Sequence, residues 1–189
     1  MGGTDALPAP GLPGLLGRYV AVVTAVAASL LVLDAVPWLL TGAVRGIVTQ
    51  RSIGEAESAL GAALLVPADA PRAYRWPPVS VRISTRGVRA AALLLTPSSE
   101  GDDSLLFVQT VDGDALPPEG LLPAGKEIHR VDFDLDGTPA RMTVLLLPPD
   151  GTFHDVSFLR AGRRVVFRFR GDPEKPLLVA RSLPRGAPR

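Results

Sequence analysis

Residues 128–147 read IHRVDFDLDGTPARMTVLLL, and this stretch indicates the fold class most clearly. Apolar and polar residues alternate over residues 128–135, which is the period of a half-buried β-strand. Asp136-Gly137 is a dipeptide typical of two-residue hairpin turns, and an apolar run returns over residues 141–147. The stretch therefore predicts an antiparallel β-hairpin.

Similar patterns continue on both sides of this hairpin. Ser52 and Glu55 have the spacing of a helix capping box, and Gly61 is a suitable residue to end that short helix. Asp172-Pro173 predicts the start of a second helix, with Asp172 as N-cap and Pro173 as the first helical residue, that runs to about Leu183. Further strands are predicted at residues 79–84, 88–96, 104–110, 153–159 and 164–170. The order predicts an α+β domain, a curved antiparallel sheet with a short helix at each end.

A stretch near the N-terminus predicts a membrane anchor. Residues 19–33 read YVAVVTAVAASLLVL, and Asp34 is the one ionisable residue within residues 19–44. A helix over residues 19–40 spans about 33 Å, which matches a hydrocarbon core of about 30 Å. We therefore expect an irregular Gly- and Pro-rich tail over residues 1–18, a transmembrane helix over 19–43, and a β-rich extramembrane domain over 44–189.

Alternatives to this anchor stay open. Residues 19–33 also fit the apolar region of a cleavable signal peptide, with the small residues Thr41-Gly42-Ala43 before the cut. A buried helix of a soluble domain is the third possibility. Asp34 has two interpretations as well: a carboxyl group near the membrane interface beside Trp38, or a hydrogen-bonding group for another transmembrane helix.

Composition excludes several function classes. The 189 residues carry 20 basic and 19 acidic side chains, and a net charge of +1 argues against a nucleic-acid partner. The chain has no cysteine, which excludes disulfides, thiolate metal ligands and cysteine nucleophiles. Glycine-rich phosphate loops and nucleophile-elbow motifs are missing from the sequence. We therefore expect a protein without a cofactor and without catalytic activity.

Two patterns resemble metal sites without completing them. Residues 132–137, DFDLDG, begin like a calcium-binding loop, but the twelfth position is Thr143, where such a loop needs a bidentate Glu. A hairpin is the preferred interpretation, and a loose cation site on exposed carboxylates is the alternative. His129 and His154, the two histidines of the chain, lack the spacing of a zinc site and are expected to be ordinary strand or loop residues.

Two segments carry candidate partner-binding residues. Arg164, Arg168 and Arg170 share one face of a predicted strand; this face is either simply solvated or docks an acidic partner or anionic headgroups. Tyr74 and Trp76 lie in a proline-bounded loop, where they are either interface anchors or part of the core. The candidate set for partner binding is Arg164, Arg168, Arg170, Tyr74, Trp76 and Asp34.

Residues 51–83, RSIGEAESALGAALLVPADAPRAYRWPPVSVRI, resemble the opening of a bacterial extracytoplasmic domain family of unknown function. Those domains begin with a Ser-x-x-Glu-Ala helix ending in Leu-Gly, followed by an apolar strand, a Pro and an aromatic residue. They end in a short helix finishing near Ser-Leu, as in PLLVARSL at residues 176–183. The resemblance covers about residues 51–184 and carries no catalytic residues. Such domains commonly follow a single membrane span in anti-sigma-factor-like proteins, and they are distantly similar to lipoprotein-carrier domains with a half-barrel sheet.

The resemblance and the anchor together give the functional expectations. Anti-sigma-factor-like proteins have a cytoplasmic domain before the span, whereas about 18 residues precede it here, so we expect no sigma-factor-binding part. The resemblance implies a single-pass protein of the bacterial cytoplasmic membrane with its domain on the extracytoplasmic side. The charges flanking the predicted span do not fix its orientation. The first hypothesis is an accessory subunit that contacts membrane lipid and other membrane-protein subunits; the alternative is a carrier or sensor of lipid or another apolar ligand.

Overall fold

The computed structural model describes residues 46–67, 73–99 and 103–186, all within the unit Val44–Arg189. The predicted tail (residues 1–18), the predicted transmembrane helix (residues 19–43) and Asp34 lie outside the described residues. Within the described ranges, no helix is both long enough and apolar enough to cross a membrane.

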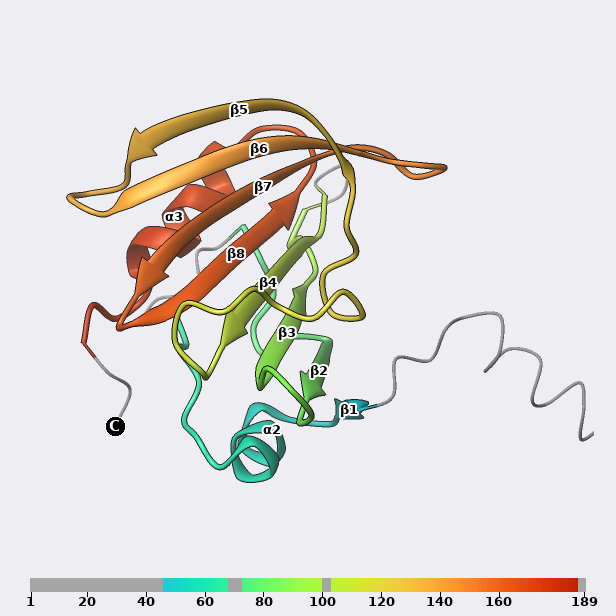
Figure 1. The fold of residues 1–189 in the computed structure, drawn as a ribbon, viewed down its shortest axis with the longest axis vertical. Helices are drawn as coiled ribbons and strands as arrows, with labels where there is room; N and C mark the ends of the chain where they lie inside the picture. Colours follow the sequence, from blue (N-terminus) through green and yellow to red (C-terminus); the bar gives the residue numbers. More distant parts are fainter. Residues whose placement is uncertain (1–45, 68–72, 100–102, 187–189) are drawn as a thin grey trace, which may run out of the picture. The chain divides into compact units, whose positions relative to one another are not determined.

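One curved sheet of eight antiparallel strands forms this unit, and two short helices accompany it (Figure 1). The strands lie in the spatial order β1-β2-β3-β4-β8-β7-β6-β5, so two meanders meet where β4 pairs with β8. The strands are β1 (Ile47–Gln50), β2 (Ser80–Ser84), β3 (Ala90–Leu95), β4 (Leu105–Thr110), β5 (Lys126–Asp134), β6 (Pro139–Leu147), β7 (Gly151–Arg160) and β8 (Arg163–Phe169). The helices are α2 (Ile53–Leu60) and α3 (Glu174–Ser182). The predicted curved antiparallel sheet with two short helices is confirmed, although β1 precedes α2.

The hairpin of β5 and β6 forms at the predicted turn. Asp136 and Gly137 both have positive φ, 53° and 81°. Leu135 and Thr138 exchange both backbone hydrogen bonds around them, at 2.8 and 3.1 Å. Asp and Gly tolerate this left-handed backbone better than other residues, which is why the dipeptide specifies a tight turn.

The helix ends follow the predicted chemistry in part. The Ser52 hydroxyl accepts a hydrogen bond from the Glu55 amide at 3.2 Å, and Gly61 ends α2 with a φ of 63°. At α3 the prediction was wrong by one residue, because Pro173 is the N-cap and the helix begins at Glu174. Asp172 still contributes, since its carboxylate accepts a hydrogen bond from the Glu174 amide at 2.9 Å.

The main core lies on the face of the sheet that both helices cover, here called the inner face. Strand residues such as Leu93, Phe107 and Phe167 pack there against Leu60 of α2 and Val179 of α3. The Phe107 and Phe167 rings stack with centroids 4.9 Å apart. Burial of these side chains from water is the main driving force that holds the helices on the sheet.

The opposite face, here called the outer face, is covered over part of its area. Leu121 and Leu122, in the connection from β4 to β5, pack on Ala92, Val108 and Val166 in a second, smaller core. This connection lies over β3, β4 and β8. The outer face of β5, β6 and β7 carries side chains that are more exposed.

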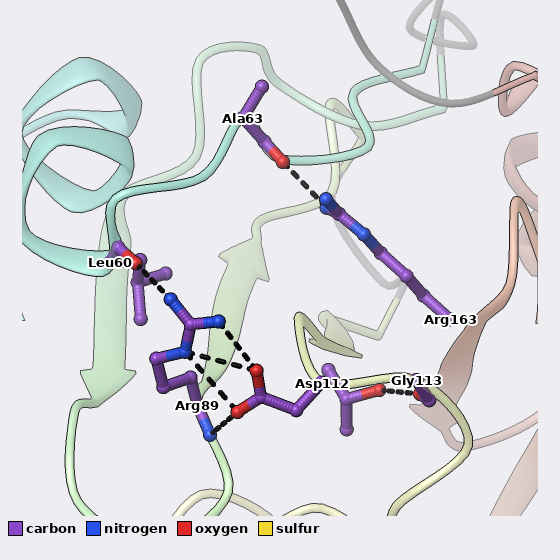
Figure 2. Close-up of polar contacts among 7 residues, drawn as sticks. Leu60, Ala63, Arg89, Asp112, Gly113 and Arg163 are labelled. Carbon is purple, nitrogen blue, oxygen red and sulfur yellow. Dashed lines mark hydrogen bonds and ion pairs between the residues drawn. The ribbon is translucent and has the colours of Figure 1, made fainter.

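Hydrogen bonds from two arginine side chains hold the end of α2 and the segment that follows it (Figure 2). Arg89 binds Asp112 with two guanidinium nitrogens, the shortest contact being 2.6 Å, and donates to the Leu60 carbonyl at 2.9 Å. Arg163 donates to the Ala63 carbonyl at 2.6 Å. The last carbonyl of α2 therefore gains a side-chain donor, as helix C-termini require, and Ala63 is held in the segment that follows.

Candidate interaction surface

A groove of about 390 Å³ crosses the uncovered outer face of β5, β6 and β7. Because side chains alternate along paired strands, Asp132, Arg141 and Ser157 stand in one row across three neighbouring strands. The lining residues are Asp132, Phe133, Pro139, Ala140, Arg141, Ser157, Phe158, Leu159 and Arg164. The long strands of the β5–β8 meander thus build the groove from several hairpins at once.

Ion pairs flank the groove at two ends. Arg141 binds the Asp132 carboxylate through two nitrogens, at 2.6 and 3.3 Å. This side-chain hydrogen bond lowers the pKa of Asp132 below its usual value of 3.8, so the carboxylate stays charged. Arg164 forms an ion pair with Asp114, which lies in the connection over β3, β4 and β8.

The floor between these pairs is partly apolar. Leu159 is 44% exposed there, and Ser157 beside it is half-buried. Exposed apolar area bordered by charged and polar groups is the usual arrangement of a protein-binding patch. Arginine adds donors that fit carboxylates, and it is enriched among residues that dominate binding energy.

The three predicted arginines share the outer face of β8 and its end, but their surroundings differ. Arg168 is 6% exposed; it binds the Asp155 carboxylate at 2.7 and 2.8 Å and the Pro123 carbonyl at 2.7 Å. The expectation that Arg168 presents an exposed guanidinium is therefore wrong, because the β4–β5 connection covers it. Arg164 is half-buried beside the groove.

Arg170 is the exposed member of the three. Its guanidinium lies over the Phe153 ring, 4.3 Å from the centroid, and donates to the Asp150 carbonyl. Together with Phe153, Asp103 and Ser104 it lines a smaller hollow of about 210 Å³. This hollow shares no lining residue with the groove.

Tyr74 and Trp76 belong to the core in the structure. Tyr74 is 7% exposed and forms an isolated antiparallel bridge with Pro97. Trp76 is partly buried against the main core cluster. Of the two interpretations given for these aromatic residues, core packing is the arrangement that the structure has.

The carboxylates of the calcium-like segment have separate contacts. Asp132 binds Arg141, the Asp134 carboxylate accepts a hydrogen bond from the Gly137 amide at 2.6 Å, and Asp136 faces Arg181 at 3.5 Å. Across the part of the chain that the structure describes, no three acidic or histidine side chains are placed to hold a metal ion.

The two histidines lie on strands, as expected, and they stand in one row across the sheet with Val144 of β6 between them. His129 is exposed on β5. The His154 ring on β7 lies 5.5 Å from that of Phe169, and its buried Nδ1 atom has no hydrogen-bond partner within the described ranges.

Sequence patterns missed most of the groove. The outer-face residues of β7 include Phe153, Asp155, Ser157 and Leu159, while its inner face carries His154. Neither face is uniformly apolar, so alternation alone does not tell which one is uncovered. Among the residues that line the groove, the sequence predicts partner binding only for Arg164, while Asp132 is predicted as part of the calcium-like segment.

The comparisons with known proteins gave no relative: no family model matches the chain, and neither a curated protein nor a solved structure matches it. The surface geometry is therefore the basis for any proposed function.

Proposed function

We propose that this chain is a membrane-anchored, non-catalytic interaction protein that docks a protein partner on the outer face of β5, β6 and β7. In this proposal the apolar segment at residues 19–33 holds the chain to a bilayer as an accessory subunit of a larger membrane complex. The β-rich domain then supplies the specificity of contact, because lipid tails compete with helix packing inside a membrane.

The outer groove is the observation that carries this proposal. It places the exposed Leu159 between two ion pairs, Asp132–Arg141 and Arg164–Asp114. The four charged side chains keep between a quarter and two thirds of their surface, from 24% at Arg164 to 66% at Asp132. A partner can therefore share these charges without the cost of burying an unpaired one.

A site-specific crosslink tests the docking surface directly. A photo-crosslinking amino acid replaces Leu159 in the full-length chain, and illumination is carried out in intact cells of the source organism. Val79, which is 66% exposed and lies outside the groove, provides the matched control position. We expect a discrete adduct with another protein from position 159 and none of that mass from position 79.

A second variant tests the charges. Arg141→Gln in the Leu159 crosslinking chain removes one ion pair, and we expect a lower adduct yield that falls further with added salt. The same adducts from positions 159 and 79 would count against the groove as the docking surface. An adduct yield that Arg141→Gln leaves unchanged would do so too.

A carrier or sensor of an apolar ligand is the second candidate. The observation that favours it lies on the inner face, where Val131 and Leu146 are 40% and 36% exposed and Met142 and Val144 are half-buried. If this surface holds a lipid chain, Leu146→Asp should weaken binding of a fluorescent acyl probe several-fold. An unchanged affinity in that variant would argue against the carrier.

A further inference from the structure

β5 has one edge that no described strand pairs. It stands last in the sheet, and β6 takes only one side of it. All its residues except the half-buried Phe133 are exposed. Figure 1 shows β5 as the last strand at one edge of the sheet. An unpaired strand edge presents free backbone donors and acceptors to other chains.

The hairpin turn tells which backbone groups of β5 point outward. Leu135 and Thr138 exchange both backbone hydrogen bonds, so this pair is hydrogen-bonded and the next pair, Asp134 with Pro139, is not. Proline at that position fits, since it has no N–H to donate. By alternation, the backbone N–H and C=O groups of Arg130 and Asp132 also point away from β6.

Two features limit how any strand can add to this edge. The pairing register shifts between Glu127 and His129, which leaves Ile128 as a bulged residue and restricts regular pairing to the residues that follow. Charged side chains also discourage unspecific edge pairing. A partner strand must therefore match the charges of Arg130 and Asp132, which within the chain pair with Glu127 and Arg141, each at 2.6 Å.

A second copy of β5 supplies that match in one register. An antiparallel pair centred on Arg130 places two arginines opposite each other, and one centred on Asp132 places two aspartates opposite each other. Centred on Val131, the pairing sets Arg130 opposite Asp132 twice, and these residues are the ones with outward backbone groups. Opposite charges on directly facing residues stabilise a strand pair, and like charges destabilise it.

The same register also matches the inner face. His129, Val131 and Phe133 pair with inner-face residues of β6, so they share that face. In the pairing centred on Val131, the two Val131 side chains meet and His129 faces Phe133 of the second copy. Val131, which is 40% exposed in the single chain, would then be covered by its own equivalent.

We infer that β5 is a self-association edge: two copies of this chain pair antiparallel about Val131 and join their sheets into one. The inference goes beyond the proposed partner docking, which uses the outer groove. Asp132 contributes to both, but Val131 lies on the inner face and outside the groove lining. A strand-only contact is small, so we expect a dimer that dissociates on dilution.

A cysteine crosslink at the two-fold axis is the test. The chain contains no cysteine, so Val131→Cys in the full-length protein introduces the one thiol available. Facing residues of a non-hydrogen-bonded antiparallel pair have Cα atoms about 4.5 Å apart, within the range of about 4.4–6.8 Å for disulfides. Under mild oxidation, with mild detergent present, we expect a disulfide-linked dimer on a non-reducing gel.

His129→Cys and Val79→Cys are the controls. His129 faces Phe133 of the second copy, and Val79 lies away from β5 on an exposed position. Neither thiol should crosslink to itself at the rate of the Val131 variant. Equal rates at all three positions would show random collision and overturn the inference.

A charge exchange tests the register. In the Val131→Cys chain, Arg130→Asp alone and Asp132→Arg alone each put like charges opposite each other, so we expect crosslinking to fall at least tenfold. Mixing the two variants restores both opposite-charge pairs, and the crosslinked dimer should return. Unchanged crosslinking in either single variant, or no recovery in the mixture, would overturn the pairing about Val131.

This outcome is independent of the docking proposal. A dimer that forms while position 159 gives no partner adduct would leave self-association standing and remove the docking surface. A partner adduct from position 159 without a crosslinked dimer would leave the docking surface standing and remove self-association.

Discussion

At the scale of single residues, Arg160 stands apart from the other arginines of the domain. It is 4% exposed, its guanidinium carbon lies 5.5 Å from the Phe158 ring centroid, and its Nε atom has no hydrogen-bond partner among the described residues. Burial, and then the nearby Arg185, lower the pKa of Arg160 below its usual value. A lowered pKa means that folding disfavours the charged form.

Arg160→Met should therefore stabilise the domain, by about 1 kcal/mol, because it removes an unsatisfied buried donor and keeps most of the side-chain volume. Arg163→Met is the matched control. Burial lowers the pKa of Arg163 too, but its guanidinium donates to the Ala63 carbonyl at 2.6 Å, so this change should destabilise. Urea unfolding of the full-length variants measures the change in the free energy of unfolding for each substitution. A loss of stability in Arg160→Met would contradict the prediction.

Asp112 carries the clearest pH dependence at this scale. The hydrogen bond from the Arg89 side chain, and then that from the Arg89 amide, lower the pKa of Asp112 below its usual value of 3.8. A carboxyl group with a lowered pKa in the folded state stabilises the fold above its unfolded-state pKa. That contribution is lost as the pH falls through the folded-state value.

We expect Asp112→Asn to melt at a lower temperature than the parent at pH 7, with the difference shrinking as the pH falls below 3.8. Thermal unfolding at pH 7 and pH 3 measures the two differences. An equal difference in melting temperature at pH 7 and pH 3 would show that the ion pair with Arg89 does not make the stability depend on pH.

At the scale of elements, a buried glutamine adds to the contacts that hold the strand-free segment after α2. Gln109 of β4 is fully buried and donates to the Leu65 carbonyl at 2.9 Å. Its side-chain oxygen accepts from the Leu65 amide at 2.7 Å. The Gln109 side chain thus makes the two backbone hydrogen bonds that a neighbouring strand would otherwise make with Leu65.

Gln109→Met should cost about 2–4 kcal/mol, because it keeps the volume but leaves a buried amide and a buried carbonyl of Leu65 without partners. The shift of the urea midpoint measures this cost. A variant with an unchanged midpoint would indicate that water or a rearranged segment satisfies Leu65.

The sequence predicts most elements because each has its own local signal. Seven strands lie within two residues of their expected starts, since apolar alternation and the Asp136-Gly137 turn are local properties. β1 was missed because IVTQ is four residues long and pairs with β2 over a long chain separation. The covering of Arg168 was missed for a similar reason, because Pro123 lies far from it in the chain.

At the scale of the whole molecule, the outer groove and the free edge of β5 are the two surfaces of the described domain to which we assign protein contacts. Apart from Asp132 and Phe133 they use different residues, so partner docking and self-association can occur on one chain. If residues 19–43 anchor the chain to a bilayer, confinement raises the effective concentration for both contacts. Deletion of residues 1–43 should then lower Val131→Cys crosslinking in cells.

Membrane retention of the full-length chain tests whether this domain works from a membrane. Membranes from cells expressing the full-length chain are washed with high salt and then with carbonate. We expect the intact chain to remain in the pellet, because the uncharged residues 19–33 need hydrocarbon. A mature N-terminus at Val44 would establish the signal-peptide alternative instead, and release of the intact chain into the supernatant would contradict the anchor.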